Sequence, residues 1–206
     1  MKHLIFDFDG VLGDTSDSRI EVLQEMDGKS KEEILISSDL YFTKSTHTRD
    51  LNMSDQALGD LQSWITKFGT LLSKKEFNLF HDFIEEIKKI SDANLAVVSS
   101  GSNIYVKPRL ENCGLEFSHI LTFEDHHSKE EKVEMICKDW GVSVKDVYFF
   151  TDTISDVVEL ENLLGKNKIY GCAWGYQGRD RLLSVLEEGN VLTNFSDIGK
   201  IFTNQN

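Results

Sequence analysis

Proline and long apolar runs are scarce in this chain of 206 residues, and each scarcity excludes a class of protein. A single proline argues against disordered or linker-rich stretches. No apolar run approaches the roughly 18 residues that mark a membrane-spanning helix. The apolar stretch near the N-terminus is too short for a signal-peptide core and lacks a small-residue cleavage site. We therefore expect a globular, cytoplasmic protein.

Basic side chains are outnumbered, with 22 Lys and Arg against 35 Asp and Glu and a formal net charge of −13. Nucleic acids and anionic membranes need basic patches, so neither is expected as a partner. A small phosphorylated metabolite remains compatible with this charge, because a bound divalent cation and a lysine can reverse the field inside a pocket. The oligomeric state stays open.

Cysteine is also rare. Cys113, Cys137 and Cys172 are odd in number, lie far apart and form no CxxC pair. This spacing favours buried, reduced thiols over a disulfide framework or a zinc site.

Short buried strands alternate with helical patterns over most of the chain. Apolar runs predict strands at 2–8, 95–99, 119–123, 146–151, 168–173 and 190–193. Such alternation indicates an α/β protein with a doubly wound parallel sheet. Ligands of these sheets bind beyond the carboxyl ends of the strands.

The segment between the first two strands is much longer than the dozen or so residues that a crossover needs. Ser30 and Ser54 are placed to cap two of its helices, and apolar spacing predicts a further helix from about Lys74 to Ser91. The excess length indicates an inserted helical subdomain. The expected bounds are 1–13 and 83–206 for the α/β core and 14–82 for the insertion.

Two acids stand at the end of the first predicted strand. Asp7 and Asp9 alternate with Phe8 on an extended backbone, so they point to the same face before Gly10 turns the chain. Like charges this close need a cation or a shared proton. The pair therefore indicates a divalent-metal site with a nucleophile beside an acid/base. An ordinary strand that ends in an Asp-Gly turn would have the same sequence pattern.

Polar side chains follow three later strands at the same expected edge of the sheet. Ser99 and Ser100 follow the second strand, where hydroxyl and N–H groups at a helix start suit phosphate oxygens. Asp152 follows the fourth strand and can join Asp7 around a cation, while Asp156 lies one turn into the next helix. Lys129 follows the third strand and can neutralise phosphate.

At this point the chain resembles the haloacid dehalogenase-like superfamily of phosphatases and phosphotransferases. The first motif of that family, DxDG(V/T)(L/V), is matched by Asp7 to Leu12, and its second, a Ser or Thr, by Ser99. The acid pair DxxxD falls on Asp152 and Asp156. The family's lysine lies about two dozen residues before that pair, which fits Lys129 best and leaves Lys132 as the alternative.

This resemblance implies a Rossmann-like core with a small helical cap, and it implies roles for the motif residues. Asp7 would attack phosphorus to give an aspartyl-phosphate, and Asp9 would act as acid and then base. Mg²⁺ would be held by Asp7, the Asp9 carbonyl and Asp152. Ser99, Ser100 and Lys129 would bind phosphoryl oxygens, while Asp156 would orient the lysine or a metal-bound water, or would itself be a metal ligand.

An acid at Asp9 favours phosphate ester hydrolysis, because dehalogenases of this superfamily lack it. The expected activity is therefore a Mg²⁺-dependent phosphatase acting on a small organic phosphate monoester. A phosphomutase or phosphotransferase of the same fold is the nearest alternative, and a non-catalytic phosphoacceptor or binding protein is the alternative from another class.

Four basic residues of the insertion are either exposed surface or contacts for a distal charge on the substrate: Arg19, Lys44, His47 and Arg49.

Overall fold

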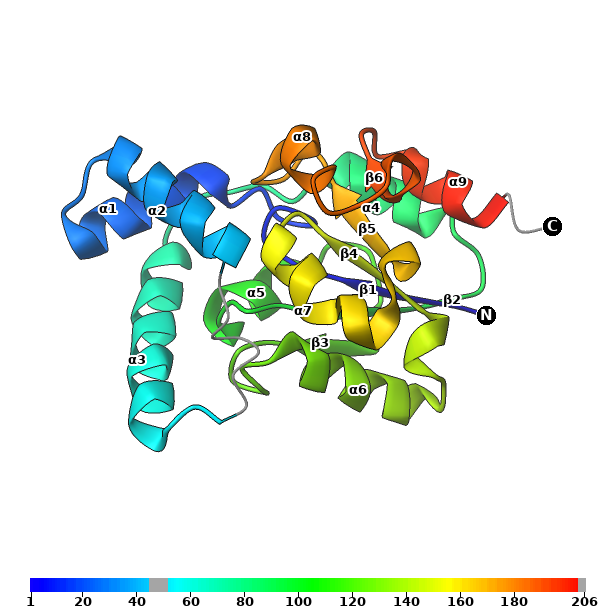
Figure 1. The fold of residues 1–206 in the computed structure, drawn as a ribbon, viewed down its shortest axis with the longest axis horizontal. Coiled ribbons are helices and arrows are strands. Elements are labelled where there is room, and N and C mark those ends of the chain that lie inside the picture. Colours follow the sequence, from blue (N-terminus) through cyan, green and yellow to red (C-terminus); the bar gives the residue numbers. More distant parts are fainter. Residues whose placement is uncertain (45–51, 204–206) are drawn as a thin grey trace.

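A six-stranded parallel sheet forms the centre of the computed structural model, which describes residues 1–44 and 52–203 (Figure 1). Its strands are β1 (Lys2–Phe6), β2 (Ala93–Val98), β3 (His119–Leu121), β4 (Val147–Thr151), β5 (Ile169–Cys172) and β6 (Val191–Leu192). Their order is β3-β2-β1-β4-β5-β6, so the chain winds outward from β1 in both directions. This order confirms the predicted doubly wound α/β fold, and every predicted strand is present.

Helices cover both faces of the sheet. One face carries α4 (His81–Lys88), α5 (Asn103–Leu110) and α9 (Asp197–Thr203), and the other carries α6 (Lys129–Trp140), α7 (Ile154–Leu164) and α8 (Gly178–Leu182). Alternation along β1 supplies both layers, because Leu4 and Phe6 pack on the first face and Ile5 on the second. The 3₁₀ turns Val144–Asp146, Lys166–Lys168 and Glu188–Asn190 precede strands.

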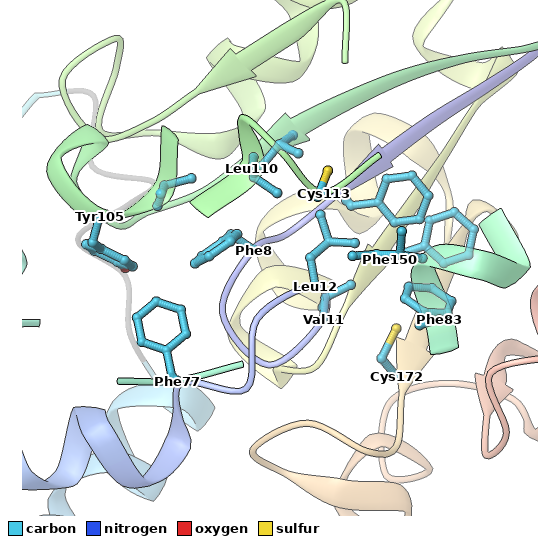
Figure 2. Packing of buried hydrophobic residues seen from close by; sticks show 14 of the residues in the cluster. Phe8, Val11, Leu12, Phe77, Phe83, Tyr105, Leu110, Cys113, Phe150 and Cys172 are labelled. Carbon is cyan, nitrogen blue, oxygen red and sulfur yellow. The ribbon is translucent and has the colours of Figure 1, made fainter. Parts of the chain in front are cut away.

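Aromatic rings dominate the first of these layers. Phe6 and Phe150, from neighbouring strands, are stacked with ring centroids 4.8 Å apart. Figure 2 shows Phe8, Phe77 and Tyr105 continuing this layer towards the turn that follows β1. The turn that carries the acids is therefore anchored in the hydrophobic core, where each buried aromatic side chain contributes on the order of 2 kcal/mol.

Three helices follow β1 before the chain returns to the sheet: α1 (Ser16–Asp27), α2 (Lys31–Lys44) and α3 (Asp55–Leu72). They stand beyond the carboxyl ends of the strands, on the left in Figure 1. Both predicted caps are present. Ser30 and Glu33 exchange hydrogen bonds at the start of α2, and the Ser54 hydroxyl accepts from the Ala57 N–H.

The chain enters and leaves these helices through two adjacent segments. The Asp14 N–H donates to the Asn78 carbonyl at 2.8 Å, and the Phe80 N–H donates to the Leu12 carbonyl at 2.8 Å. This pairing corrects the predicted helix from Lys74 to Ser91, since α4 spans only His81–Lys88. The segment before α4 is extended because its backbone hydrogen bonds go to the outgoing segment.

Cys113, Cys137 and Cys172 are buried and unpaired, as the sequence predicts. Within residues 1–44 and 52–203, no helix combines the length and apolarity needed to cross a lipid bilayer.

Candidate active site

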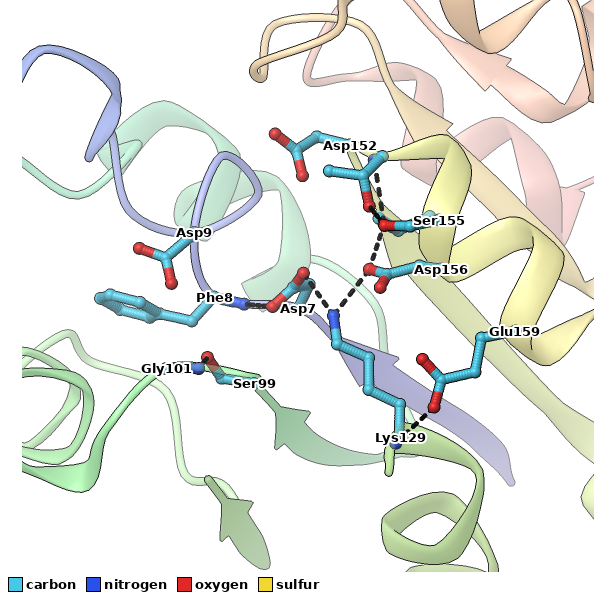
Figure 3. A network of polar contacts seen from close by, with 12 residues as sticks. Asp7, Phe8, Asp9, Ser99, Gly101, Lys129, Asp152, Ser155, Asp156 and Glu159 are labelled. Atoms are coloured by element: carbon cyan, nitrogen blue, oxygen red, sulfur yellow. Dashed lines mark hydrogen bonds and ion pairs between the residues drawn. The ribbon is translucent and has the colours of Figure 1, made fainter. Parts of the chain in front are cut away.

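Asp7 lies at the centre of a buried polar network at the carboxyl edge of the sheet (Figure 3). Its N–H donates to the Phe150 carbonyl, which extends the pairing of β1 with β4 by one residue. Its Oδ1 accepts from the Phe8 N–H at 2.6 Å, and its Oδ2 accepts from the Lys129 ammonium at 2.6 Å. Both oxygens are thus fixed by the protein.

Lys129 opens α6 and is buried along its whole length. Figure 3 shows its side chain reaching across to two carboxylates. Its ammonium lies 2.6 Å from Asp7 Oδ2 and 2.6 Å from Asp156 Oδ2. At the other end of the residue, its N–H donates to Glu159 Oε1 at 2.7 Å. The lysine is held at both ends by side chains of α7.

Burial and neighbouring charges act in opposite directions on the pKa values of Asp7, Lys129 and Asp156. Burial raises the pKa of Asp7 well above its usual value, although the Lys129 charge opposes the rise. Burial alone would lower the pKa of Lys129, but Asp156 and Asp7 raise it above its ordinary value. Burial also opposes ionisation of Asp156, but Lys129 and Thr151 hold the pKa of that carboxyl below its usual value. Lys129 therefore stays cationic beside these acids.

Asp9 projects from the turn away from this lysine and binds two hydroxyl groups. The Thr15 hydroxyl donates to Oδ1 at 2.7 Å, and the Tyr105 hydroxyl donates to Oδ2 at 2.6 Å. Burial raises the pKa of Asp9, and the hydrogen bonds from Tyr105 and Thr15 oppose this rise. Of the two acids in the first motif, Asp9 thus has hydroxyl partners where Asp7 has an ammonium.

Asp152 follows β4 and faces the turn at Gly10. The backbone at Gly10 has φ of 72°, and a Cβ there would collide with the Asp152 carboxylate, so only glycine allows this approach. The Asp152 Oδ2 accepts from the Tyr176 N–H at 2.6 Å. Burial raises the pKa of Asp152 to about 7. Among the described residues, no basic group forms an ion pair with it.

The donor chemistry here fits a hard divalent cation. A buried carboxylate without a cationic partner, next to Asp7 and a main-chain turn, supplies the oxygen ligands that Mg²⁺ prefers. No group of three Asp, Glu, His or Cys side chains in the described parts of the chain forms a complete metal cage. A cation held by Asp7 and Asp152 therefore also needs main-chain, substrate or water oxygens, which is usual for Mg²⁺.

The serines after β2 divide into a buried and an open residue. Ser99 is fully buried, and its Oγ accepts from the Gly101 N–H at 2.9 Å, which shapes the turn. Ser100 and Gly101 line the cavity above it.

Lys132, the alternative lysine, points elsewhere. Its ammonium donates to the carbonyls of Ser99, at 2.6 Å, and of Thr122, at 3.3 Å. Burial and the nearby charge of Lys129 lower the pKa of Lys132 to about 7. Lys129 is therefore the lysine that contacts the acids, and Lys132 supports the serine turn.

A cavity of about 450 Å³ lies between this edge of the sheet and helices α1 to α3. Its floor includes Asp7, Asp9, Lys129 and Asp152, which the fold brings together from three strand ends. Its walls are mainly apolar and come from the inserted helices. A concave, mainly apolar pocket with a few convergent polar groups is typical of a small-molecule site.

Three contacts of the site were not predicted from the sequence. Thr15 and Tyr105 bind Asp9, and Glu159 binds the start of α6. Of the basic residues proposed for the insertion, Arg19 lines the cavity. His47 and Arg49 lie outside the described residues, as does the side chain of Lys44.

Comparisons with known proteins agree with this geometry. A sequence profile described as haloacid dehalogenase-like hydrolase matches residues 4–160. No curated protein matches the chain in sequence. Similar solved structures include a predicted phosphatase from Clostridium acetobutylicum, 17% identical with a TM-score of 0.69, over 97% of this chain and 96% of that one.

Two further solved structures have the same fold. A hydrolase from Pseudomonas syringae is 14% identical with a TM-score of 0.74, over 97% of each chain. A variant of CbbY from Rhodobacter sphaeroides, in complex with xylulose 1,5-bisphosphate, is 17% identical with a TM-score of 0.65, over 97% of this chain and 96% of that one. At these identities the likeness establishes the fold alone.

Proposed function

The chain belongs to the haloacid dehalogenase-like hydrolases, and from this premise we propose that it is a Mg²⁺-dependent phosphatase of small organic phosphate monoesters. The observation that carries the proposal is the different surroundings of two adjacent acids. Asp7 is paired with an ammonium, whereas Asp9 is bound only by hydroxyl groups. One acid is thereby suited to attack as a carboxylate and the other to carry a proton.

In the first step an Asp7 carboxylate oxygen forms a bond to phosphorus, and the bond between phosphorus and the leaving alcohol oxygen breaks. Asp9 gives its proton to that oxygen, so the alcohol leaves neutral. The Lys129 ion pair favours the ionised form of Asp7 that this attack needs, and it opposes the rise that burial gives the pKa of Asp7. Burial also raises the pKa of Asp9, which favours its protonated form. The product is an aspartyl-phosphate on Asp7.

In the second step Asp9, now a carboxylate, takes a proton from a water molecule that attacks phosphorus. The acyl-phosphate bond breaks, inorganic phosphate leaves and Asp7 is restored. Ser100, the Gly101 turn and Lys129 line the cavity where the phosphoryl oxygens would bind, with Ser99 shaping that turn. Asp156 keeps the Lys129 ammonium in place.

Asp7, Asp152 and the Asp9 carbonyl would hold Mg²⁺, which would offset charge on the transferring phosphoryl group. This role suits Asp152 because its carboxylate is buried and forms no ion pair with the described side chains. A cation would compensate its negative charge, which burial disfavours.

The substrate class is supported by the size of the cavity and by its position between the strand ends and helices α1 to α3. The bound sugar bisphosphate of CbbY shows that one relative of this fold accepts a small phosphorylated compound. Helices α1 to α3 would act as a cap that limits access of bulk water to the acyl-phosphate.

The test measures phosphate release from p-nitrophenyl phosphate and a panel of phosphate monoesters with Mg²⁺, and again with EDTA. We expect turnover that requires Mg²⁺ and that falls by at least about 1000-fold in Asp7→Asn. A phosphoryl adduct on Asp7, detected by mass spectrometry after rapid acid quench, is expected in the wild type only.

The matched control is Asp17→Asn, which makes the same chemical change on the exposed side of α1. Its rate should equal that of the wild type. Equal rates for Asp7→Asn and the wild type, or no turnover of any ester, would contradict the proposed function.

A further inference from the structure

Arg19 is a half-buried cation on the wall of the cavity that forms no ion pair within the described residues. Its Nη1 donates to the Ser38 hydroxyl at 3.0 Å, and its guanidinium carbon lies 4.6 Å from the centre of the Phe42 ring and 5.6 Å from that of Tyr176. Within the described residues, no carboxylate lies within ion-pair distance of it. Ser38 is the one side-chain acceptor of this guanidinium among the described residues, so most of its five N–H donors are left for a ligand in the cavity that Arg19 lines.

This arrangement leaves the guanidinium able to bind an anion. Burial lowers the pKa of Arg19, although Tyr176, Tyr41 and Asp9 oppose the change. A guanidinium keeps its charge at any ordinary pH, so it cannot respond by losing a proton. Aromatic faces hold it flat and contribute some attraction. The aromatic rings do not accept hydrogen bonds from the N–H groups at the planar end of the guanidinium. The geometry of these N–H groups matches the oxygen atoms of a carboxylate or a phosphate.

The position of Arg19 in α1 places it on the side where an alcohol would leave. The Arg19 N–H donates to the Thr15 carbonyl one helical turn earlier, and the Thr15 hydroxyl binds Asp9. Residues four apart share a face of a helix. Arg19 and Asp9 line the same cavity and are close enough for the charge of each to act on the pKa of the other.

We propose that Arg19 binds a second anionic group carried by the leaving alcohol, so that the preferred substrates are phosphate monoesters of hydroxy acids or bisphosphates of small diols. This inference rests on the proposed phosphatase function. Phosphorus at Asp7 and the second anion at Arg19 would hold the ester at both ends. Asp9 would then lie beside the oxygen that leaves.

The competing possibility is an apolar leaving group, since Trp64, Ile65 and Phe68 also line the cavity. An apolar substrate would leave the Arg19 charge buried and unpaired. A charge that is removed from water without an ion-pair partner is disfavoured, whereas an anion compensates it. Charge therefore favours the anionic substrate over the apolar one.

The experiment compares pairs of esters that differ only in charge. Phosphate monoesters of glycolate and glycolamide form one pair, and those of 3-hydroxypropanoate and 3-hydroxypropanamide form a longer pair. The bisphosphate of ethylene glycol tests phosphate in place of carboxylate. For each ester, kcat/KM is measured with the wild type, Arg19→Gln, Arg19→Lys and Arg179→Gln.

We expect the wild type to prefer the carboxylate or the bisphosphate over the amides. Arg19→Gln should reduce kcat/KM for the preferred anion by roughly 30-fold or more, and it should change that for the amides by less than about 3-fold. Arg19→Lys should be intermediate, because lysine is a point charge. Arg179→Gln removes an equal charge from an exposed surface pair with Glu188 and should change neither.

Turnover of the amides as fast as the acids, or an equal loss on both in Arg19→Gln with an unchanged melting temperature, overturns this inference and leaves the phosphatase function standing. Absence of turnover for every ester overturns both. Whichever anion, carboxylate or phosphate, shows the larger loss in Arg19→Gln identifies the second group.

Discussion

At the scale of single residues, the site depends on how each oxygen of the two adjacent acids is occupied. Asp9 has both oxygens fixed, by Thr15 from the start of the insertion and by Tyr105 from α5. Tyr105 reaches Asp9 by passing over Gly101, where a Cβ would collide with the tyrosine hydroxyl. Its ring packs edge-on against Phe8 and Phe77, so the hydroxyl has little freedom to move.

Tyr105→Phe should weaken proton donation by Asp9 and leave the fold intact, because the ring keeps its packing. General acid catalysis matters most for poor leaving groups. We expect kcat/KM to fall roughly 10-fold for alkyl phosphates, and by less than about 3-fold for p-nitrophenyl phosphate. The measurement is kcat/KM across esters with leaving alcohols of increasing pKa.

Tyr170→Phe is the control, since it removes a hydroxyl from a partly buried ring that stacks on Phe150, on another strand. It should give the same slope against leaving-group pKa as the wild type. A uniform loss across the series in Tyr105→Phe would show that the tyrosine only supports packing.

The acids of the site were predictable from the sequence, but their hydroxyl partners were not. Asp7, Asp9 and Asp152 follow buried strands, and parallel strands bring their carboxyl ends to one edge. Tyr105 reads as an ordinary apolar position of α5. Its contact with Asp9 depends on the space left by Gly101 and on the angle at which α5 leaves the turn, which no local pattern encodes.

At the scale of elements, α7 positions the start of α6 with two acids one turn apart. Asp156 accepts a hydrogen bond from the Lys129 ammonium, and Glu159 accepts one from the main-chain N–H of the same residue. Glu159 also accepts from the Ser128 hydroxyl at 3.3 Å. A carboxylate at this end of a helix is favoured by the free N–H groups there. The helix pair thereby places the lysine against Asp7.

Glu159→Ala should both destabilise the protein and displace Lys129. Loss of the acceptor leaves a buried N–H unpaired, which costs about 1–3 kcal/mol. We expect the free energy of unfolding in urea to fall by that amount and kcat to fall about 10-fold or more, since small displacements of a phosphate-binding group slow the reaction.

Glu159→Gln keeps an oxygen acceptor and should recover most of both losses. Glu161→Ala is the control for surface charge. Glu161 lies on α7, as Glu159 does, and it pairs with Lys166 in the 3₁₀ turn that follows this helix. Full activity in Glu159→Ala despite lowered stability would show that α6 holds Lys129 without this contact.

Helix caps were predicted more accurately than the helix that follows the insertion. The capping patterns at Ser30 and Ser54 are local, and both are present. The prediction that a helix starts near Lys74 was wrong, because Phe77 and Phe80 have helical spacing but lie in the returning segment before α4. Phe77 packs against Phe8, so its burial results from tertiary contact and the spacing is coincidental.

At the scale of the whole molecule, the acidic surplus of the chain also appears in the candidate active site. Asp7, Asp9, Asp152 and Asp156 line one cavity in which Lys129 is paired with two of them. We propose that the paired segments around Gly13 and Leu79 divide the insertion from the core. The acids would then lie on the core side of this boundary, where a cation can stabilise them.

Asp152 contributes to the pH dependence of stability. Its pKa is raised from an ordinary 3.8 to about 7 by burial. Between these values the folded protein binds more protons than the unfolded chain, so the stability contributed by protonated Asp152 is lost as pH rises through about 7. A bound cation compensates the ionised form, and its effect should grow over the same range.

We therefore expect Mg²⁺ to raise the melting temperature more at pH 8 than at pH 6, compared with EDTA at equal ionic strength. Asp152→Asn should melt higher than the wild type in EDTA at pH 8, and Mg²⁺ should no longer shift it. Each kcal/mol corresponds to roughly 2–4 °C for a chain of this size. Asp39→Asn, on the surface of α2, should respond to Mg²⁺ as the wild type does. An equal Mg²⁺ shift at both pH values, or one that survives Asp152→Asn, would place the cation elsewhere.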